Sequence, residues 1–140
     1  MGFIFSCNWF FSKNNILGLE YFKLREFDCS CCGENSGEDN MDIEFLEMLD
    51  CARSYAGIPF HISSGFRCKN WNKKIGGVPK SSHIIGKAAD IVCSNSKDRA
   101  LMIGSLFEAG FMRIGISGDK NFLHVDNDIE NKASPVIWLY

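Results

Sequence analysis

The segment from Ser81 to Asp90, around which we organise the rest of the chain, reads SSHIIGKAAD. It places one imidazole, His83, and one carboxylate, Asp90, seven residues apart, with a glycine between them where the backbone can turn. A second imidazole, His124, lies downstream among apolar residues, and the chain has only three histidines. Two histidines and an aspartate with an open fourth position form a ligand set that a catalytic zinc ion accepts. The sequence therefore predicts a zinc site at His83, Asp90 and His124.

The surroundings of these residues favour a metal site over three unrelated polar residues. Asp90 lies in the apolar segment Ala88–Val92, where a buried carboxylate costs free energy unless a cation compensates its charge. Arg67 or Lys87 could be that cation, which is the alternative, purely structural interpretation. One bound ion accounts for Asp90 and both histidines together, whereas the alternative needs a separate partner for each.

The rest of the chain predicts an α+β domain, with a small antiparallel sheet and helices packed around it. Apolar residues recur at helical spacing over 41–56 and 96–109, and a glycine follows each run. Short apolar runs predict strands at 60–63, 88–93, 112–117 and 122–127. The last two form a hairpin through a turn at 118–121, which puts His124 and Asp126 on the face opposite Leu123 and Val125.

Length and charge restrict the class of protein. With 140 residues, we expect one domain over 19–140, preceded by an irregular apolar segment over 1–18. The net charge of −2 gives no electrostatic case for nucleic acid, and no apolar run is long enough for stable membrane insertion. The N-terminus lacks a basic start and a small-residue cleavage site, so we do not interpret it as a signal peptide.

The seven cysteines are many for this length. Three of them fall within Cys29–Cys32. A second, cysteine-only zinc site there would need further ligands from Cys51, Cys68 or Cys93, and the sequence leaves disulfides, free thiols and metal binding all open.

The pattern Ser81-x-His83-x-x-Gly86-x-Ala88-x-Asp90 resembles the signature of zinc-dependent peptidoglycan peptidases of the D-Ala-D-Ala carboxypeptidase type. That group includes phage endolysins and vancomycin-resistance dipeptidases, and it shares its core with the hedgehog signalling domain. The resemblance extends over about residues 20 to 140 and includes four further segments: Tyr21–Cys31, the approach from Ser64 to Pro79, Phe122–Asp126 and the closing Trp138-x-Tyr140.

The resemblance implies a hedgehog-like or D-Ala-D-Ala-peptidase-like fold, with His83, Asp90 and His124 as zinc ligands and water in the fourth position. It also implies that Arg67 grips a substrate carboxylate or carbonyl, for which its fork of donors is suited, and that Ser82 lines the cleft.

The sequence departs from the family where many members carry an acid as general base, three positions before the last histidine. This chain has Asn121 there, which cannot take a proton from water. Asp126 and Asp119 are the candidate replacements. Asp126 could equally orient a ligand histidine, which is the role we favour.

The substrate implied by the resemblance is the stem peptide of bacterial peptidoglycan, cleaved by a monomeric carboxypeptidase or endopeptidase. A phage or prophage endolysin, made in the cytoplasm and acting on the wall after release, fits the lack of an export signal. Two alternatives stay open: a non-catalytic zinc-containing wall-binding domain and an interaction module of hedgehog type.

Overall fold

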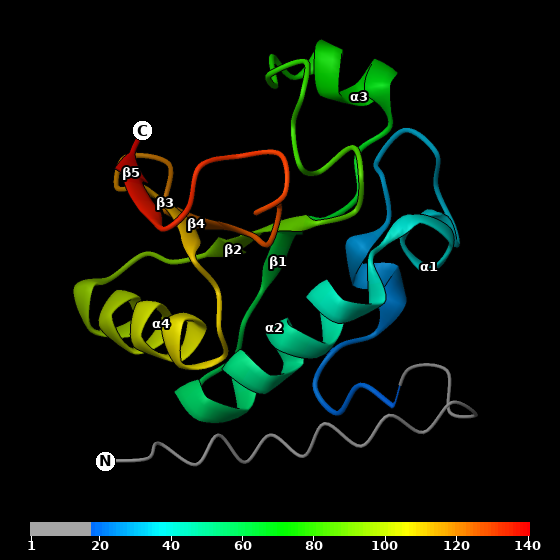
Figure 1. The fold of residues 1–140 in the computed structure, drawn as a ribbon. Helices are drawn as coiled ribbons and strands as arrows, with labels where there is room; N and C mark the ends of the chain where they lie inside the picture. The colour runs from blue at the N-terminus through cyan, green and yellow to red at the C-terminus, as the bar shows by residue number, and fades with distance from the viewer. Residues whose placement is uncertain (1–17) are drawn as a thin grey trace.

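The structure, a computed structural model, describes residues 18–140, so nearly all of the predicted apolar segment over 1–18 lies outside the described residues. Its centre is a five-stranded sheet in the order β1-β2-β4-β3-β5 (Figure 1). The strands are β1 (Ile62–Ser64), β2 (Ala88–Val92), β3 (Arg113–Ser117), β4 (Phe122–Asp126) and β5 (Val136–Leu139). The predicted α+β class is confirmed.

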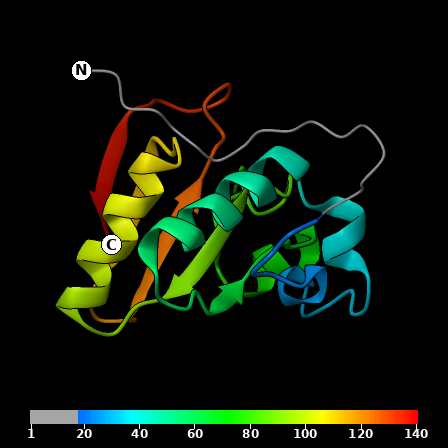
Figure 2. The ribbon, with the colours of Figure 1, turned by 90° about the horizontal axis from the view of Figure 1, so that it is seen from below.

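Two long helices cover one face of this sheet, as Figures 1 and 2 show: α2 (Ile43–Ala56) and α4 (Ser96–Glu108). Both begin at a side-chain cap, because Asp42 accepts a hydrogen bond from the backbone of Phe45 and Asn95 accepts one from that of Asp98. The shorter elements are the 3₁₀ helix η1 (Leu24–Phe27), α1 (Ser36–Asn40) and α3 (Lys69–Lys74). The helix α3 lies on the opposite side of the sheet from α2 (Figure 1).

The β3–β4 hairpin separates the core from the polar residues. Its turn pairs Ser117 with Phe122, so Arg113 pairs with Asp126. The side chains of Leu123 and Val125 are fully buried in the apolar core under the helices. Because side chains alternate along a strand, those of His124 and Asp126 point to the other face.

The sheet is mixed, and not wholly antiparallel as predicted. The strand β5 returns to the outer edge of β3 and pairs with it in parallel, with Gly115 opposite Trp138. The connection over residues 127–135 crosses from β4 to the far side of β3, which makes this parallel pairing possible. In the described part of the chain, no helix has the length and apolar character that a bilayer crossing requires.

Candidate metal centre

Backbone pairing and one sharp turn bring His83, Asp90 and His124 together. Asp90 in β2 stands directly opposite His124 in the neighbouring strand β4. His83 precedes β2 and is folded back by Gly86, whose φ is +70° and whose position would put a β-carbon 1.9 Å from the Asn40 carbonyl oxygen. Only glycine fits that position. As a result, one potential ligand atom from each of the three residues lies within 4.8 Å of the others.

The ring of His83 is oriented by a backbone carbonyl. Its Nδ1 lies 2.7 Å from the carbonyl oxygen of Gly65, which can only accept, so Nδ1–H donates. The lone pair of Nε2 is then left facing Asp90 Oδ1, 3.3 Å away. Burial lowers the pKa of His83, so the imidazole is held neutral, as a metal ligand must be.

The ring of His124 has the opposite orientation. Its Nε2 donates to Asp126 Oδ2 at 2.9 Å, and its Nδ1 faces Asp90 Oδ1 at 3.0 Å. Burial alone would lower the pKa of His124, but the hydrogen bonds to Asp126 and Asp90 outweigh burial and raise it. Burial would likewise raise the pKa of Asp90, but interactions with its neighbours, led by the hydrogen bond from His124, outweigh burial and keep that pKa well below its ordinary value.

The three potential ligand atoms fit a zinc ion. Tetrahedral bonds of about 2.0–2.1 Å place two ligand atoms roughly 3.3 Å apart, and the contacts of Asp90 Oδ1 with the two imidazole nitrogens are 3.3 and 3.0 Å. Among residues 18–140, no further histidine, cysteine or acidic residue joins these three as a fourth ligand. Three protein ligands and an open position are the pattern of a catalytic site.

Arg67 is the cation beside Asp90. Its Nη2 lies 2.6 Å from Asp90 Oδ2, its Nε donates to Ser64 Oγ, and its backbone N–H donates to the carbonyl of His83. The ion pair of the structural interpretation is therefore present on one carboxylate oxygen, and the other oxygen faces the two histidines, which leaves it available to a metal ion. The substrate-gripping role of Arg67 stays a prediction.

Asp126 lies behind His124, away from the group of ligand atoms, and is fully buried. While Oδ2 accepts from His124, Oδ1 accepts from Arg113 Nε at 2.7 Å and from the backbone N–H of Asp128 at 3.1 Å. Both oxygens are engaged, and the imidazole ring stands between this carboxylate and the open position. The geometry favours the orienting role over that of general base.

The sequence reasoning missed Arg113, although the signal was available. A turn at 118–121 fixes the hairpin register and pairs residue 113 with residue 126. A buried arginine opposite an inward aspartate indicates an ion pair, and Arg113 also donates to the carbonyl of Ala133.

Two other predicted residues lie elsewhere. Ser82 is 1% exposed, with its hydroxyl donating to Asp128 Oδ2 and accepting from Lys132 Nζ, so it differs from the expected cleft residue. Asp119 lies exposed in the hairpin turn, where it accepts from the hydroxyl of Ser117 at 3.2 Å, and it is not in the ligand group. Asn121 adopts a φ of +54° in the same turn, a conformation that asparagine tolerates better than most residues.

An aromatic wall from β5 borders the ligands. The ring centroid of Trp138 lies 5.4 Å from that of His124, and the guanidinium of Arg113 lies 5.3 Å from the Trp138 ring. Gly115 makes this contact possible, because a β-carbon there would lie 2.6 Å from the indole. Tyr140 packs beside Trp138 and is exposed.

Comparison with known proteins agrees with this geometry. No curated protein matches the chain significantly. The family model described as Peptidase M15 matches residues 20–126, a span that contains all three ligand residues, Arg67 and Asp126. Because this match covers most of the sequence, the chain belongs to the Peptidase M15 family, whose members are zinc-dependent metallopeptidases.

Proposed function

We propose that the protein is a zinc peptidase that hydrolyses stem-peptide bonds of bacterial peptidoglycan, as a carboxypeptidase or an endopeptidase. The observation that carries the proposal is the convergence of His83 Nε2, Asp90 Oδ1 and His124 Nδ1 on one point with no fourth protein ligand among the described residues. Membership of the Peptidase M15 family supports the reaction class. The cell-wall substrate rests on the specific resemblance of the segment Ser81–Asp90.

Each residue of the site has a distinct task in this proposal. When bound, zinc would polarise the scissile carbonyl and lower the pKa of a bound water toward about 7. Gly65 and Asp126 hold the two imidazole rings in the orientation that binding needs. Arg67 uses part of its guanidinium on Asp90 and Ser64, and its remaining N–H groups can take a substrate carboxylate or carbonyl.

The substrate chemistry suits the borders of the site. Stem peptides carry free carboxylates, which Arg67 can pair with beside the metal. Trp138 and Tyr140 offer an apolar wall on the β5 side, and Tyr140 is exposed enough to contact a bound peptide. We place the peptide between Arg67 and this aromatic pair.

The acceptor of the water proton is the open part of the mechanism. Asn121 occupies the position where many members carry an acid, and Asp126 has both oxygens engaged. Asp119, in the hairpin turn five residues before His124, is the remaining candidate, tested by Asp119→Asn. The same observation favours a second candidate function, a zinc-containing domain that binds the wall without cutting it.

Digestion of purified peptidoglycan by the zinc-loaded full chain, with products read by mass spectrometry, tests the proposal. We expect the wild type to release a defined peptide and His83→Ala to release none. His61→Ala is the matched control, because His61 is exposed and lies outside the ligand group. Product masses name the bond.

Stoichiometric zinc without cleavage would reject the peptidase in favour of the wall-binding domain, which pull-down on insoluble peptidoglycan then measures. The endolysin role, with synthesis in the cytoplasm and action after release, belongs to the same proposal. Lysis of wall-exposed bacteria by added protein, abolished in His83→Ala, would support it.

A further inference from the structure

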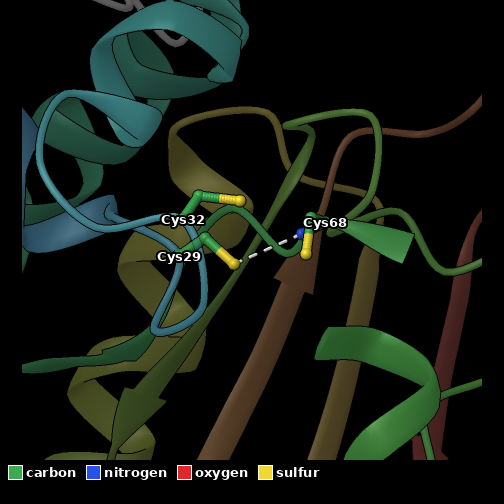
Figure 3. A group of neighbouring side chains, drawn as sticks. All are labelled: Cys29, Cys32 and Cys68. Atoms are coloured by element: carbon green, nitrogen blue, oxygen red, sulfur yellow. Dashed lines mark hydrogen bonds between the residues drawn. The ribbon is translucent and has the colours of Figure 1, made fainter. Parts of the chain in front are cut away.

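A second group of metal-binding side chains lies outside the site just described. The sulfur atoms of Cys29, Cys32 and Cys68 lie within 4.8 Å of one another (Figure 3). Cys29 and Cys32 come from the loop after η1, and Cys68 directly precedes α3, so two segments far apart in sequence meet there. The exposed thiol of Cys31 lies beside this group, and the Cys68 thiol raises the pKa of Cys31.

Backbone N–H groups already point at two of these sulfurs. The N–H of Cys68 donates to Cys29 Sγ at 3.4 Å, drawn as the dashed line in Figure 3, and that of Trp71 donates to Cys68 Sγ at 3.3 Å. The bond from Trp71 lowers the pKa of Cys68. Such donors favour sulfur in its thiolate form, which is the form that binds metal.

We propose that Cys29, Cys31, Cys32 and Cys68 bind a second zinc ion, which has a structural role. Four thiolates in a tetrahedron are a closed zinc set with no position for water, in contrast to the His83 site. Zinc–sulfur bonds of about 2.3 Å place neighbouring sulfurs roughly 3.8 Å apart. The sulfur atoms of Cys29, Cys32 and Cys68 lie within 4.8 Å of one another, so only a small inward movement is needed to reach this spacing. Cys31 and Cys32 are exposed, and their side chains are free to make such a movement.

The position of this ion gives it a clear structural effect. It would join the segment around η1 to the segment Ser64–Cys68. These segments already approach closely, since the N–H of Phe66 donates to the carbonyl of Phe27, and a β-carbon on Gly65 would lie 2.5 Å from Phe27 Cα.

The segment held in this way also supports the first metal site. The carbonyl of Gly65 orients His83, and Arg67 pairs with Asp90. Cys68 is the next residue after Arg67. The cysteine site therefore fixes the backbone from which the His83 ring and the Asp90 carboxylate are oriented.

Charge and chemistry both favour zinc. Thiolate ligands select zinc over the hard cations magnesium and calcium. Four thiolates around one zinc leave a net charge of −2, and the nearby charge of Lys74 acts on Cys31 in the compensating direction. A disulfide between two of the same cysteines is the competing state, and it would exclude the ion.

Zinc content of the full chain, purified under reducing conditions and dialysed against buffered zinc, tests the proposal. We expect about two zinc ions per wild-type chain and about one in each of His83→Ala and Cys32→Ser. Cys93→Ser is the matched control and keeps two, because Cys93 lies outside the group and its thiol donates to the carbonyl of Asn95. Cys31→Ser gives a second variant at an exposed position, where no buried packing is lost.

Cobalt substitution gives a readout that does not depend on activity. Thiolate-to-cobalt charge-transfer absorption should appear in the wild type and in His83→Ala, and should be lost in Cys32→Ser. One zinc ion per wild-type chain that disappears in His83→Ala would overturn the proposal. So would a disulfide within Cys29–Cys32 or to Cys68, found by mass spectrometry after thiols are blocked at lysis. Neither result touches the peptidase proposal, which depends on the His83 site alone.

Discussion

Replacing Asp126 by alanine separates an orienting residue from a general base. In the structure Asp126 has two side-chain partners, since one oxygen accepts from His124 Nε2 at 2.9 Å and the other from Arg113 Nε at 2.7 Å. Asp126→Ala removes both of these bonds and leaves the buried guanidinium of Arg113 with the carbonyl of Ala133 as its remaining hydrogen-bond acceptor, beside the Trp138 ring. The variant should therefore lose zinc affinity and stability together.

The two losses have different sizes. Loss of a partner that orients a metal-bound histidine typically costs 10- to 100-fold in metal affinity, which is about 1.4–2.7 kcal/mol. Removing one member of a buried ion pair costs about 3–5 kcal/mol of folding stability. The larger loss is due to the uncompensated charge of Arg113, and the smaller one to the unsupported ring of His124.

A second substitution isolates the two effects. Arg113→Met in the Asp126→Ala background removes the uncompensated charge and fills a similar volume. We expect urea denaturation of the metal-free double variant to show that more than half of the lost stability returns. Zinc affinity, measured by competition with a chelator, should stay weak, because His124 still lacks its acceptor.

The reasoning would be refuted by an Asp126→Ala protein that binds zinc within about threefold of the wild type and no longer cleaves peptide. That result would make Asp126 the general base. A loss of stability below about 1 kcal/mol would separately contradict the buried ion pair with Arg113.

Two further predictions concern protonation and the turn at Gly86. Above pH 6.5, zinc affinity should rise with pH by about tenfold per unit until His124 loses its extra proton, because the pKa of His124 is raised and zinc must displace that proton. Over the same pH range the metal-free protein should lose stability. A histidine whose pKa is raised by folding contributes stability below its unfolded-state pKa, and this contribution is lost as the pH rises through its folded-state pKa. A parallel rise of zinc affinity and of stability with pH would contradict this. Gly86→Ala should destabilise by more than about 2 kcal/mol, because it combines a left-handed φ with a clash against Asn40, and chemical denaturation measures it. Gly104→Ala is its control: it lies in α4 with nothing within 4 Å of the added carbon and should be neutral or stabilising by about 0.5–1 kcal/mol, so equal losses in both variants would reject the steric argument.

The parts of the fold that the sequence predicts are those set by local pattern. The helix α2 and the β3–β4 hairpin follow from apolar spacing and turn composition, and the hairpin alone places His124 and Asp126 on the face away from the core. Gly86 is identifiable as a turn, but its contact with Asn40 depends on packing between distant segments.

What the sequence does not show are contacts between separate segments. The parallel pairing of β5 with β3 depends on a crossover whose course no local pattern fixes. Ser82 lies next to His83 in the sequence, but its side chain is buried and contacts Asp128 and Lys132, which are 46 and 50 residues later. The meeting of Cys68 with Cys29 and Cys32 likewise needs the approach of Gly65 to Phe27, which is visible only in three dimensions.

The charges around His124 explain how one site can be both well folded and ready for a metal. The pKa of His124 is raised because its hydrogen bonds to Asp90 and Asp126 are both made when each ring nitrogen carries a proton. Arg67 and Arg113 each neutralise one of those carboxylates from the outside. Metal binding then needs only the Nδ1 proton to leave, while the Nε2 bond to Asp126 and both arginine pairs persist. The surrounding structure is therefore already arranged for the ion: at His124 Nδ1 a proton would give way to Zn²⁺, which His83 Nε2 and Asp90 Oδ1 would also hold.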